Sequence, residues 1–285
     1  MISHGLRDKV VLVTGGASGI GRAIALQAAR DGAHIAIVDA SAERAEATAA
    51  ELRAEGRRAI ALAVDVRDSG ACDAAVARIE SELGPIDGMV ASAGVSPPSP
   101  AAQMSDEVWS RCIDINLTGM FRSIRPVGRR MLERRRGAIV AIASVDGMGG
   151  HAARAHYSAS KHGVIGLTRS LAIEWGRHGV RVNAIAPGVV DTPLLRANIP
   201  PDHKRHAMVD RVPLARLSRA EEQAGPALFL LSDAASYVTG SVLAVDGGTS
   251  AGWFTRWNGA DLGSRALLDQ GVYGEPDFTN TDMEA

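Results

Sequence analysis

The sequence is poor in cysteine, in net charge and in long apolar runs, and each scarcity excludes a class of protein. Two cysteines in 285 residues, Cys72 and Cys112, cannot build a disulfide framework, which favours a reducing cytoplasm. Lys and Arg (31) nearly balance Asp and Glu (32), so no overall field would attract nucleic acid. No apolar run reaches the roughly 18 residues of a membrane span. We therefore expect a soluble cytoplasmic protein that binds neither nucleic acid nor membrane.

What the sequence does contain is a regular alternation of short β-branched runs with longer helical patterns. The predicted strands are Val10–Thr14, His34–Asp39, Ala59–Val64, Gly88–Ser92, Ala138–Ala143, Val180–Ala186 and Val242–Val245. The predicted helices are Ile20–Arg30, Ala42–Glu55, Ser69–Leu83, Asp106–Arg135, Ala155–Arg177 and Arg219–Leu231. Such alternation predicts the α/β class, a single Rossmann-type doubly wound domain with a parallel sheet. Its ligand crevice is expected at the carboxyl ends of the strands.

The alternation covers residues 1–248, and two segments depart from it. Gly188–Pro213 is a long proline-containing excursion, and loops of that length in compact folds are usually functional lids. Residues 249–285 form a C-terminal extension with five of the eleven aromatic residues of the chain. Exposed aromatic side chains would leave apolar patches, so we expect the extension to pack against another surface.

The segment Thr14–Gly21 (TGGASGIG) follows the first predicted strand and opens the first predicted helix. Glycine permits a tight turn and a close backbone approach, and the free N–H groups of a helix start favour an anion. A glycine-rich turn alone is weak evidence, but the strand–turn–helix context is that of dinucleotide binding. The residues expected at the pyrophosphate are Gly15, Ser18, Gly19, Ile20 and Gly21.

An acidic residue ends the second predicted strand. Asp39 lies 18 residues beyond Gly21, and a carboxylate there can accept both ribose hydroxyls of adenosine. The same charge would repel a 2′-phosphate, and the neighbouring residues Ala40 and Ser41 supply no cation to offset the repulsion. The sequence therefore predicts NAD as the cofactor in preference to NADP.

A tyrosine and a lysine four residues apart begin the predicted helix at residue 155. This spacing places Tyr157 and Lys161 on one helix face, where the ammonium would favour the phenolate. An ordinary surface pair has the same spacing. Ser144, 13 residues before the tyrosine at the end of the fifth strand, makes an active site the better interpretation.

Taken together, these motifs closely resemble the short-chain dehydrogenase/reductase family from about Lys9 to Gly248. The resemblance implies a seven-stranded parallel sheet, a homotetramer and NAD(P)-linked interconversion of alcohols and ketones. It makes Tyr157 the acid–base, Ser144 the group that orients the substrate oxygen, and Lys161 the group that holds the nicotinamide ribose and lowers the tyrosine pKa. Asn116 resembles the asparagine that anchors a proton-relay water.

The resemblance also implies further cofactor contacts, and it leaves one departure from the family pattern. The implied contacts are Asp65, Val66, Ala93, Gly94, Pro187, Gly188, Val190 and Thr192. The usual Asn-Asn-Ala-Gly after the fourth strand is Ala91-Ser92-Ala93-Gly94 here, so packing near the adenosine ribose is expected to differ. The residues expected at the substrate, besides Ser144 and Tyr157, are Asp146, His151, Leu194 and Leu195.

Three residues before the tyrosine were open to two interpretations. His151, Arg154 and His156 could suggest metal or phosphate ligands, but no carboxylate–histidine spacing supports a metal, so solvated loop residues are the preferred interpretation.

Two other functions are kept open for the whole chain. One is epimerisation or dehydration of a nucleotide sugar by the same tyrosine and lysine, and the other is cofactor sensing without turnover. The substrate and the direction of the reaction are not encoded in any motif.

Overall fold

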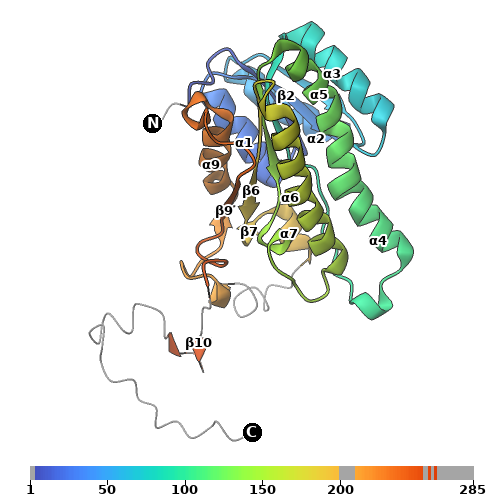
Figure 1. Cartoon of the computed structure of the whole chain (residues 1–285), viewed down its shortest axis with the longest axis vertical. Coiled ribbons are helices and arrows are strands. Elements are labelled where there is room, and N and C mark those ends of the chain that lie inside the picture. The colour runs from blue at the N-terminus through green and yellow to red at the C-terminus, as the bar shows by residue number, and fades with distance from the viewer. Residues whose placement is uncertain (1–3, 199–208, 253–255, 258–259, 262–285) are drawn as a thin grey trace, which may run out of the picture.

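A computed structural model describes residues 4–198, 209–252, 256–257 and 260–261. Its main feature is a parallel sheet of seven strands in the order β3-β2-β1-β4-β5-β6-β9 (Figure 1). The strands are β1 Val10–Thr14, β2 His34–Asp39, β3 Ala59–Ala63, β4 Ile86–Ala91, β5 Gly137–Ile142, β6 Val180–Pro187 and β9 Val242–Val245. The predicted seven-stranded Rossmann-type sheet is confirmed. The strand order reverses between β1 and β4, and a ligand crevice is expected at that point.

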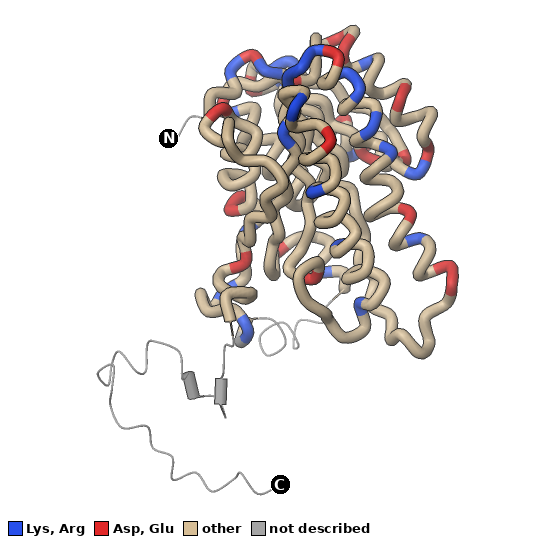
Figure 2. Tube along the Cα trace, viewed as in Figure 1, with Lys and Arg blue, Asp and Glu red and all other residues tan. Residues whose placement is uncertain are grey.

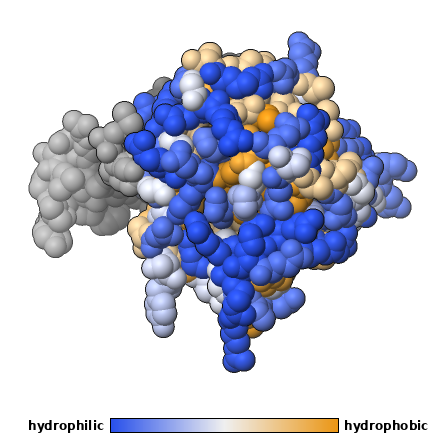
Figure 3. All heavy atoms as spheres, turned by 90° about the horizontal axis from the view of Figure 1, so that it is seen from above, coloured by the Kyte–Doolittle hydropathy of each residue, from blue (hydrophilic) through white to orange (hydrophobic). Residues whose placement is uncertain are grey.

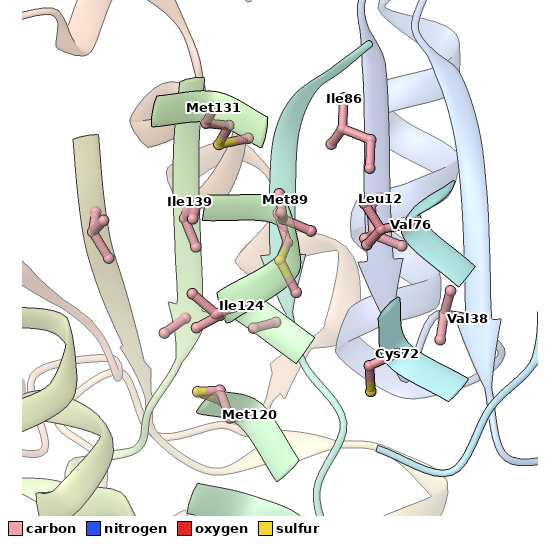
Figure 4. Packing of buried hydrophobic residues seen from close by; sticks show 14 of the residues in the cluster. Leu12, Val38, Cys72, Val76, Ile86, Met89, Met120, Ile124, Met131 and Ile139 are labelled. Carbon is pink, nitrogen blue, oxygen red and sulfur yellow. The ribbon is translucent and has the colours of Figure 1, made fainter. Parts of the chain in front are cut away.

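Helices cover both faces of the sheet, because its strands are apolar on both sides. The helices are α1 Gly19–Arg30, α2 Ala42–Ala54, α3 Ser69–Leu83, α4 Asp106–Ile113, α5 Met120–Arg134, α6 Ala155–Gly176, α7 Pro193–Asn198 and α9 Ala224–Leu231. One hydrophobic cluster joins α3, α5 and α6 to the sheet, and a second joins α1, α2 and α9 to its other face. In Figure 4, Met120, Ile124 and Met131 of α5 point toward Met89 and Ile139 of the sheet.

The long helix predicted over Asp106–Arg135 is interrupted. A π-helical segment, Asp114–Gly119, separates α4 from α5. Two contacts account for the wide turn: the Asn116 side chain bonds the backbone of Val95, and Gly119 lies so close to Val66 that an added Cβ would meet its Cγ2 at 2.6 Å. Single π-turns inside α-helices are often found at functional sites.

Between β6 and β9 the chain forms small elements beside the carboxyl ends of the strands. β7 Val190–Asp191 pairs in parallel with β8 Ser218–Arg219, and α7 follows β7. The excursion predicted over Gly188–Pro213 thus contains a short strand and a short helix, and its residues 199–208 lie outside the described part of the chain. Of the aromatic residues in the extension, only Trp257, in β10 Arg256–Trp257, falls within an element that the structure describes.

Charge is distributed unevenly along the strand direction. Figure 2 shows Lys, Arg, Asp and Glu gathered mainly at the upper end, where the strands begin, whereas the lower end carries fewer of them. Seen from above, that upper end presents hydrophilic residues around a small apolar centre (Figure 3). No helix in the described residues combines the length and apolarity that crossing a membrane requires.

Candidate active site

A large cavity opens at the carboxyl ends of the strands, between the β1 turn, β4, β5 and α7. Its volume is about 1370 Å³, which is ample for a dinucleotide with a small substrate. The predicted cofactor residues that line it are Gly15, Ser18, Gly19, Ile20, Asp39, Asp65, Val66, Ala93, Gly94, Pro187, Gly188, Val190 and Thr192. Gly21 is absent from this wall: it supports the turn from behind, where an added Cβ would meet the Gly15 oxygen at 2.4 Å.

The glycine turn has the conformation that close approach of a phosphate requires. Gly15 has a φ of +64°, and a Cβ on it would meet the Ala93 nitrogen at 2.8 Å, so only glycine fits. Helix α1 begins after Ser18, whose side chain accepts no capping hydrogen bond. The first amides of α1 therefore remain open to the cavity, and such a helix start favours an anion.

Near the glycine turn, Asp39 lines the cavity and is buried, and backbone amides hold it in place. Its Oδ2 accepts from Ala17 N at 3.3 Å and its Oδ1 from Ser41 N at 3.0 Å. The guanidinium of Arg44, on the first turn of α2, lies 3.6 Å from Oδ1. The expectation that no cation stands beside Asp39 is therefore wrong. The first turn of α2 places Arg44, five residues further along the chain, next to the Asp39 carboxylate.

Asp65 lies on the same side of the cavity and is also paired with a cation. The Arg67 side chain donates to both carboxylate oxygens, with Nε at 3.0 Å from Oδ1 and 2.9 Å from Oδ2. These hydrogen bonds lower the pKa of Asp65. Neither Arg44 nor Arg67 was singled out from the sequence, because nothing in their local pattern distinguishes them from surface arginines.

The three residues predicted at the reacting centre lie together at the middle of the cavity. Ser144 follows β5, Tyr157 and Lys161 come from the first turns of α6, and all three line the same wall. The Ser144 Oγ accepts from Asp146 N at 3.1 Å, which fixes the serine at the start of a 3-10 turn. The Lys161 Nζ donates to the Ile142 carbonyl at 2.7 Å and lies 5.5 Å from the centre of the Tyr157 ring.

Burial has the largest effect on the pKa values of Tyr157 and Lys161. It raises the pKa of Tyr157 to about 12, an effect that the nearby Ser144 hydroxyl opposes. It lowers the pKa of Lys161 to about 8, because a buried ammonium loses its hydration. The expected depression of the tyrosine pKa by the lysine is thus absent from this state, in which Lys161 is turned to a carbonyl.

Asn116 lies behind the catalytic wall and does not line the cavity. Its amide nitrogen donates to Val95 O at 2.9 Å and to Ser160 Oγ at 3.1 Å, and its oxygen accepts from Val95 N at 2.8 Å. These hydrogen bonds join the π-helical segment to the loop after β4 and to α6.

The residues predicted at the substrate also reach the cavity. Asp146, His151, Leu194 and Leu195 line it beside Tyr157. The His151 Nδ1 lies 3.4 Å from Asp146 Oδ2 at the mouth.

The interpretation of Arg154 and His156 as solvated loop residues is wrong. Arg154 is 8% exposed and His156 is fully buried, because the start of α6 packs under the loop after β4. In the described residues, no group of three or more His, Cys, Asp or Glu side chains could hold a metal ion.

Comparisons with known proteins agree with this geometry. Residues 15–250 match the family model described as enoyl-(acyl carrier protein) reductase. The chain is 44% identical to the cis-4-hydroxycyclohexanecarboxylate dehydrogenase of Sinomonas cyclohexanicum, over 86% of this chain and 97% of that protein. It is 37% identical to the 3-oxoacyl-[acyl-carrier-protein] reductase of Thermotoga maritima, over 85% and 98% of the two chains.

A solved structure extends the likeness to three dimensions. The putative NAD(P)-dependent gluconate 5-dehydrogenase of Beutenbergia cavernae, which has NADP bound at low occupancy, is 39% identical and covers 88% of this chain and all of its own, with a TM-score of 0.83. The chain belongs to the short-chain dehydrogenase/reductase family of oxidoreductases.

Proposed function

We propose that this oxidoreductase uses NAD to transfer a hydride to or from the carbinol carbon of a secondary alcohol. The observation that carries the proposal is the meeting of Ser144, Tyr157 and Lys161 on one wall of a cavity whose other end holds the glycine turn. A phenol beside a hydroxyl can exchange a proton with an alcohol oxygen, which is the proton chemistry that alcohol oxidation requires. The relatives support this reaction type, since they are named for alcohol oxidation and ketone reduction.

The preference for NAD rests on Asp39. Two backbone amides hold its carboxylate at the adenosine end, where it would accept the two ribose hydroxyls. The same carboxylate would repel a 2′-phosphate. Arg44 weakens this argument, since it could pair with such a phosphate, but its side chain is 62% exposed whereas that of Asp39 is 9% exposed. The buried charge should therefore outweigh the solvated one.

The reacting groups have distinct tasks. The nicotinamide, when bound, supplies the carbon that accepts or gives the hydride. Ser144 donates a hydrogen bond to the substrate oxygen, and Tyr157 takes the hydroxyl proton in oxidation or returns it in reduction. Lys161 holds the nicotinamide ribose, and Asn116 supports the π-helical segment that anchors a relay water.

The raised pKa of Tyr157 bears on its role as a base. A phenol with a pKa of about 12 is a poor base at neutral pH. A cation beside the phenol favours its ionised form, and Lys161, 5.5 Å from the ring centre, is the cation that this chain supplies there. Oxidised nicotinamide, when bound, would add positive charge beside the same ring.

A substrate panel tests the proposal against its alternatives. Wild-type protein would be incubated with NAD or NADP and secondary alcohols, and with reduced cofactor and ketones, a 3-oxoacyl thioester or an enoyl thioester. Absorbance of the reduced nicotinamide then reports turnover. We expect NAD-linked turnover of secondary alcohols and their ketones. Turnover of a thioester alone would favour acyl-chain reduction, and cofactor binding without any turnover would favour cofactor sensing. Conversion of a nucleotide sugar without net change in cofactor would indicate an epimerase or a dehydratase.

A further inference from the structure

A buried arginine next to the catalytic tyrosine has no role in the proposed reaction. Arg154 lies at the N-terminal boundary of α6, three residues before Tyr157, and is 8% exposed. It lines the same cavity as Ser144 and Tyr157. Burying a guanidinium costs free energy unless partners compensate for the lost hydration, so its contacts should reveal what it is there to meet.

The contacts of Arg154 within the described residues use only part of its side chain. Nη1 donates to the carbonyl oxygen of Ser96 and, at 2.8 Å, to the Ser96 hydroxyl. These bonds join the loop after β4 to the start of α6. Nε and Nη2 make no hydrogen bond to described residues, although a guanidinium carries five N–H groups in a planar fork.

The charge of Arg154 is also left without a direct partner among the described side chains. No carboxylate there forms an ion pair with it within 4.0 Å, and the Asp146 carboxylate of the same cavity lies 3.4 Å from His151 Nδ1. Arg154 and Lys161 are cationic and Asp146 is anionic, so the described charges at the reacting centre leave an excess of positive charge. The same excess holds for the whole cavity, whose described lining includes six Arg or Lys residues and three Asp residues.

We propose that Arg154 forms an anion-binding subsite and that the substrate is a hydroxy acid or its keto acid, whose carboxylate binds Arg154 while its carbinol carbon lies at Tyr157. This inference rests on the proposed function. The free edge of the guanidinium matches a carboxylate, which accepts two parallel N–H···O bonds. Arg154 is the N-cap residue of α6 and Tyr157 lies on its first turn, so the carboxylate should lie several bonds from the carbinol carbon.

The test compares acids with their neutral esters. The probes are 3-hydroxybutanoate, 4-hydroxypentanoate and 5-hydroxyhexanoate, each beside its methyl ester, and kcat/KM is measured with NAD. For at least one of the longer acids, we expect wild type to prefer the acid over its ester by more than about tenfold, as charge-assisted bonds would give. Arg154→Met should reduce that ratio to near one, because kcat/KM falls further for the acid than for the ester.

The control is Arg111→Met, which removes an exposed cation of the same cavity from α4 and should leave the ratio unchanged. Arg154→Lys keeps the charge without the fork and should give an intermediate ratio. A wild type that shows no preference for any acid overturns the inference, and so does an Arg154→Met variant that slows acid and ester equally. Absence of turnover with every alcohol would instead contradict the proposed function. If Arg154→Met does not fold, the wild-type ratio and Arg154→Lys decide the matter.

Discussion

At the scale of single residues, three groups are central to the proposed chemistry and to the proposed choice of cofactor. Burial raises the pKa of Tyr157 and lowers the pKa of Lys161. The carboxylate of Asp39 accepts hydrogen bonds from two backbone amides, which take the place of water. Each of these groups has an effect that can be measured without knowledge of the substrate.

The lowered pKa of Lys161 should appear in the pH dependence of stability. The folded protein releases this proton near pH 8 and the unfolded chain near pH 10.5, so the unfolded state holds more protons between these values. Stability without cofactor should therefore rise as pH increases through that window, by up to about 2 kcal/mol between roughly pH 7.5 and 9.5. Urea unfolding of wild type and Lys161→Met measures this. The variant should lack the rise, and equal pH dependence in both proteins would show that Lys161 is not the group responsible.

Cofactor choice should follow Asp39. The double substitution Asp39→Ala with Ala40→Arg removes the repulsive carboxylate and adds a phosphate partner. The ratio of kcat/KM for NAD to that for NADP should fall by more than about tenfold in this variant. Arg44→Ala is the matched control and should leave the wild-type preference for NAD in place. A wild type that prefers NADP would contradict the assignment of NAD directly.

At the scale of elements, the turn between β1 and α1 carries the tightest steric requirement. Gly15→Ala places a methyl group on a residue with a positive φ and against the Ala93 backbone, so NAD affinity should fall by more than about tenfold.

A second glycine serves as a control for the effect of an added methyl group. Gly166 on α6 has no atom within 4 Å of an added Cβ. Gly166→Ala should therefore stabilise the protein by about 0.5–1 kcal/mol and leave binding unchanged. Calorimetric titration with NAD and urea unfolding check both; normal NAD binding by Gly15→Ala would argue against this turn as the phosphate site.

The elements were largely predictable because their periodicity is local. β1, β2 and β9 have the predicted bounds, and the other five-to-eight-residue strands differ from the predicted bounds by at most two residues at an end. The π-helical segment could not be predicted from the sequence. Its wide turn depends on the contacts of Asn116 and Gly119 with residues about 20 and 50 positions away. The burial of Arg154 was missed for the same reason, because the loop that covers it comes from Ser96.

At the scale of the whole molecule, the first question is how many copies of the chain assemble. We propose a homotetramer, in keeping with the family expectation. Exposed apolar side chains support an assembled state: Trp109 and Phe121 are 43% and 38% exposed on α4 and α5, and Ile173 is 83% exposed on α6. In an oligomer such surfaces can be buried between subunits related by symmetry.

The C-terminal extension, residues 249–285, can be tested for a role in assembly and in substrate binding. Thr249 and Ser250 line the cavity, whereas Trp253, Phe254 and Tyr273 lie outside the described residues. Our hypothesis is that Trp253, Phe254 and Trp257 pack at the assembly interface and that the later segment around Tyr273 reaches the mouth of a substrate pocket. The alternative is a tail folded back on its own subunit. Truncation after Ser250 should then lower the oligomer mass in sedimentation or raise KM for the substrate, with NAD affinity preserved. Unchanged mass, stability and kinetics would rule the hypothesis out.

The most direct measurement of the central claim compares Tyr157→Phe with wild type on one alcohol that wild type oxidises, with NAD affinity determined in parallel. Removal of the phenolic hydroxyl deletes the proton-transfer group and little else. The account predicts a rate of NADH formation lower by about a hundred- to ten-thousand-fold, with the dissociation constant for NAD nearly unchanged. A Tyr157→Phe protein that keeps more than about a tenth of the wild-type rate would contradict it.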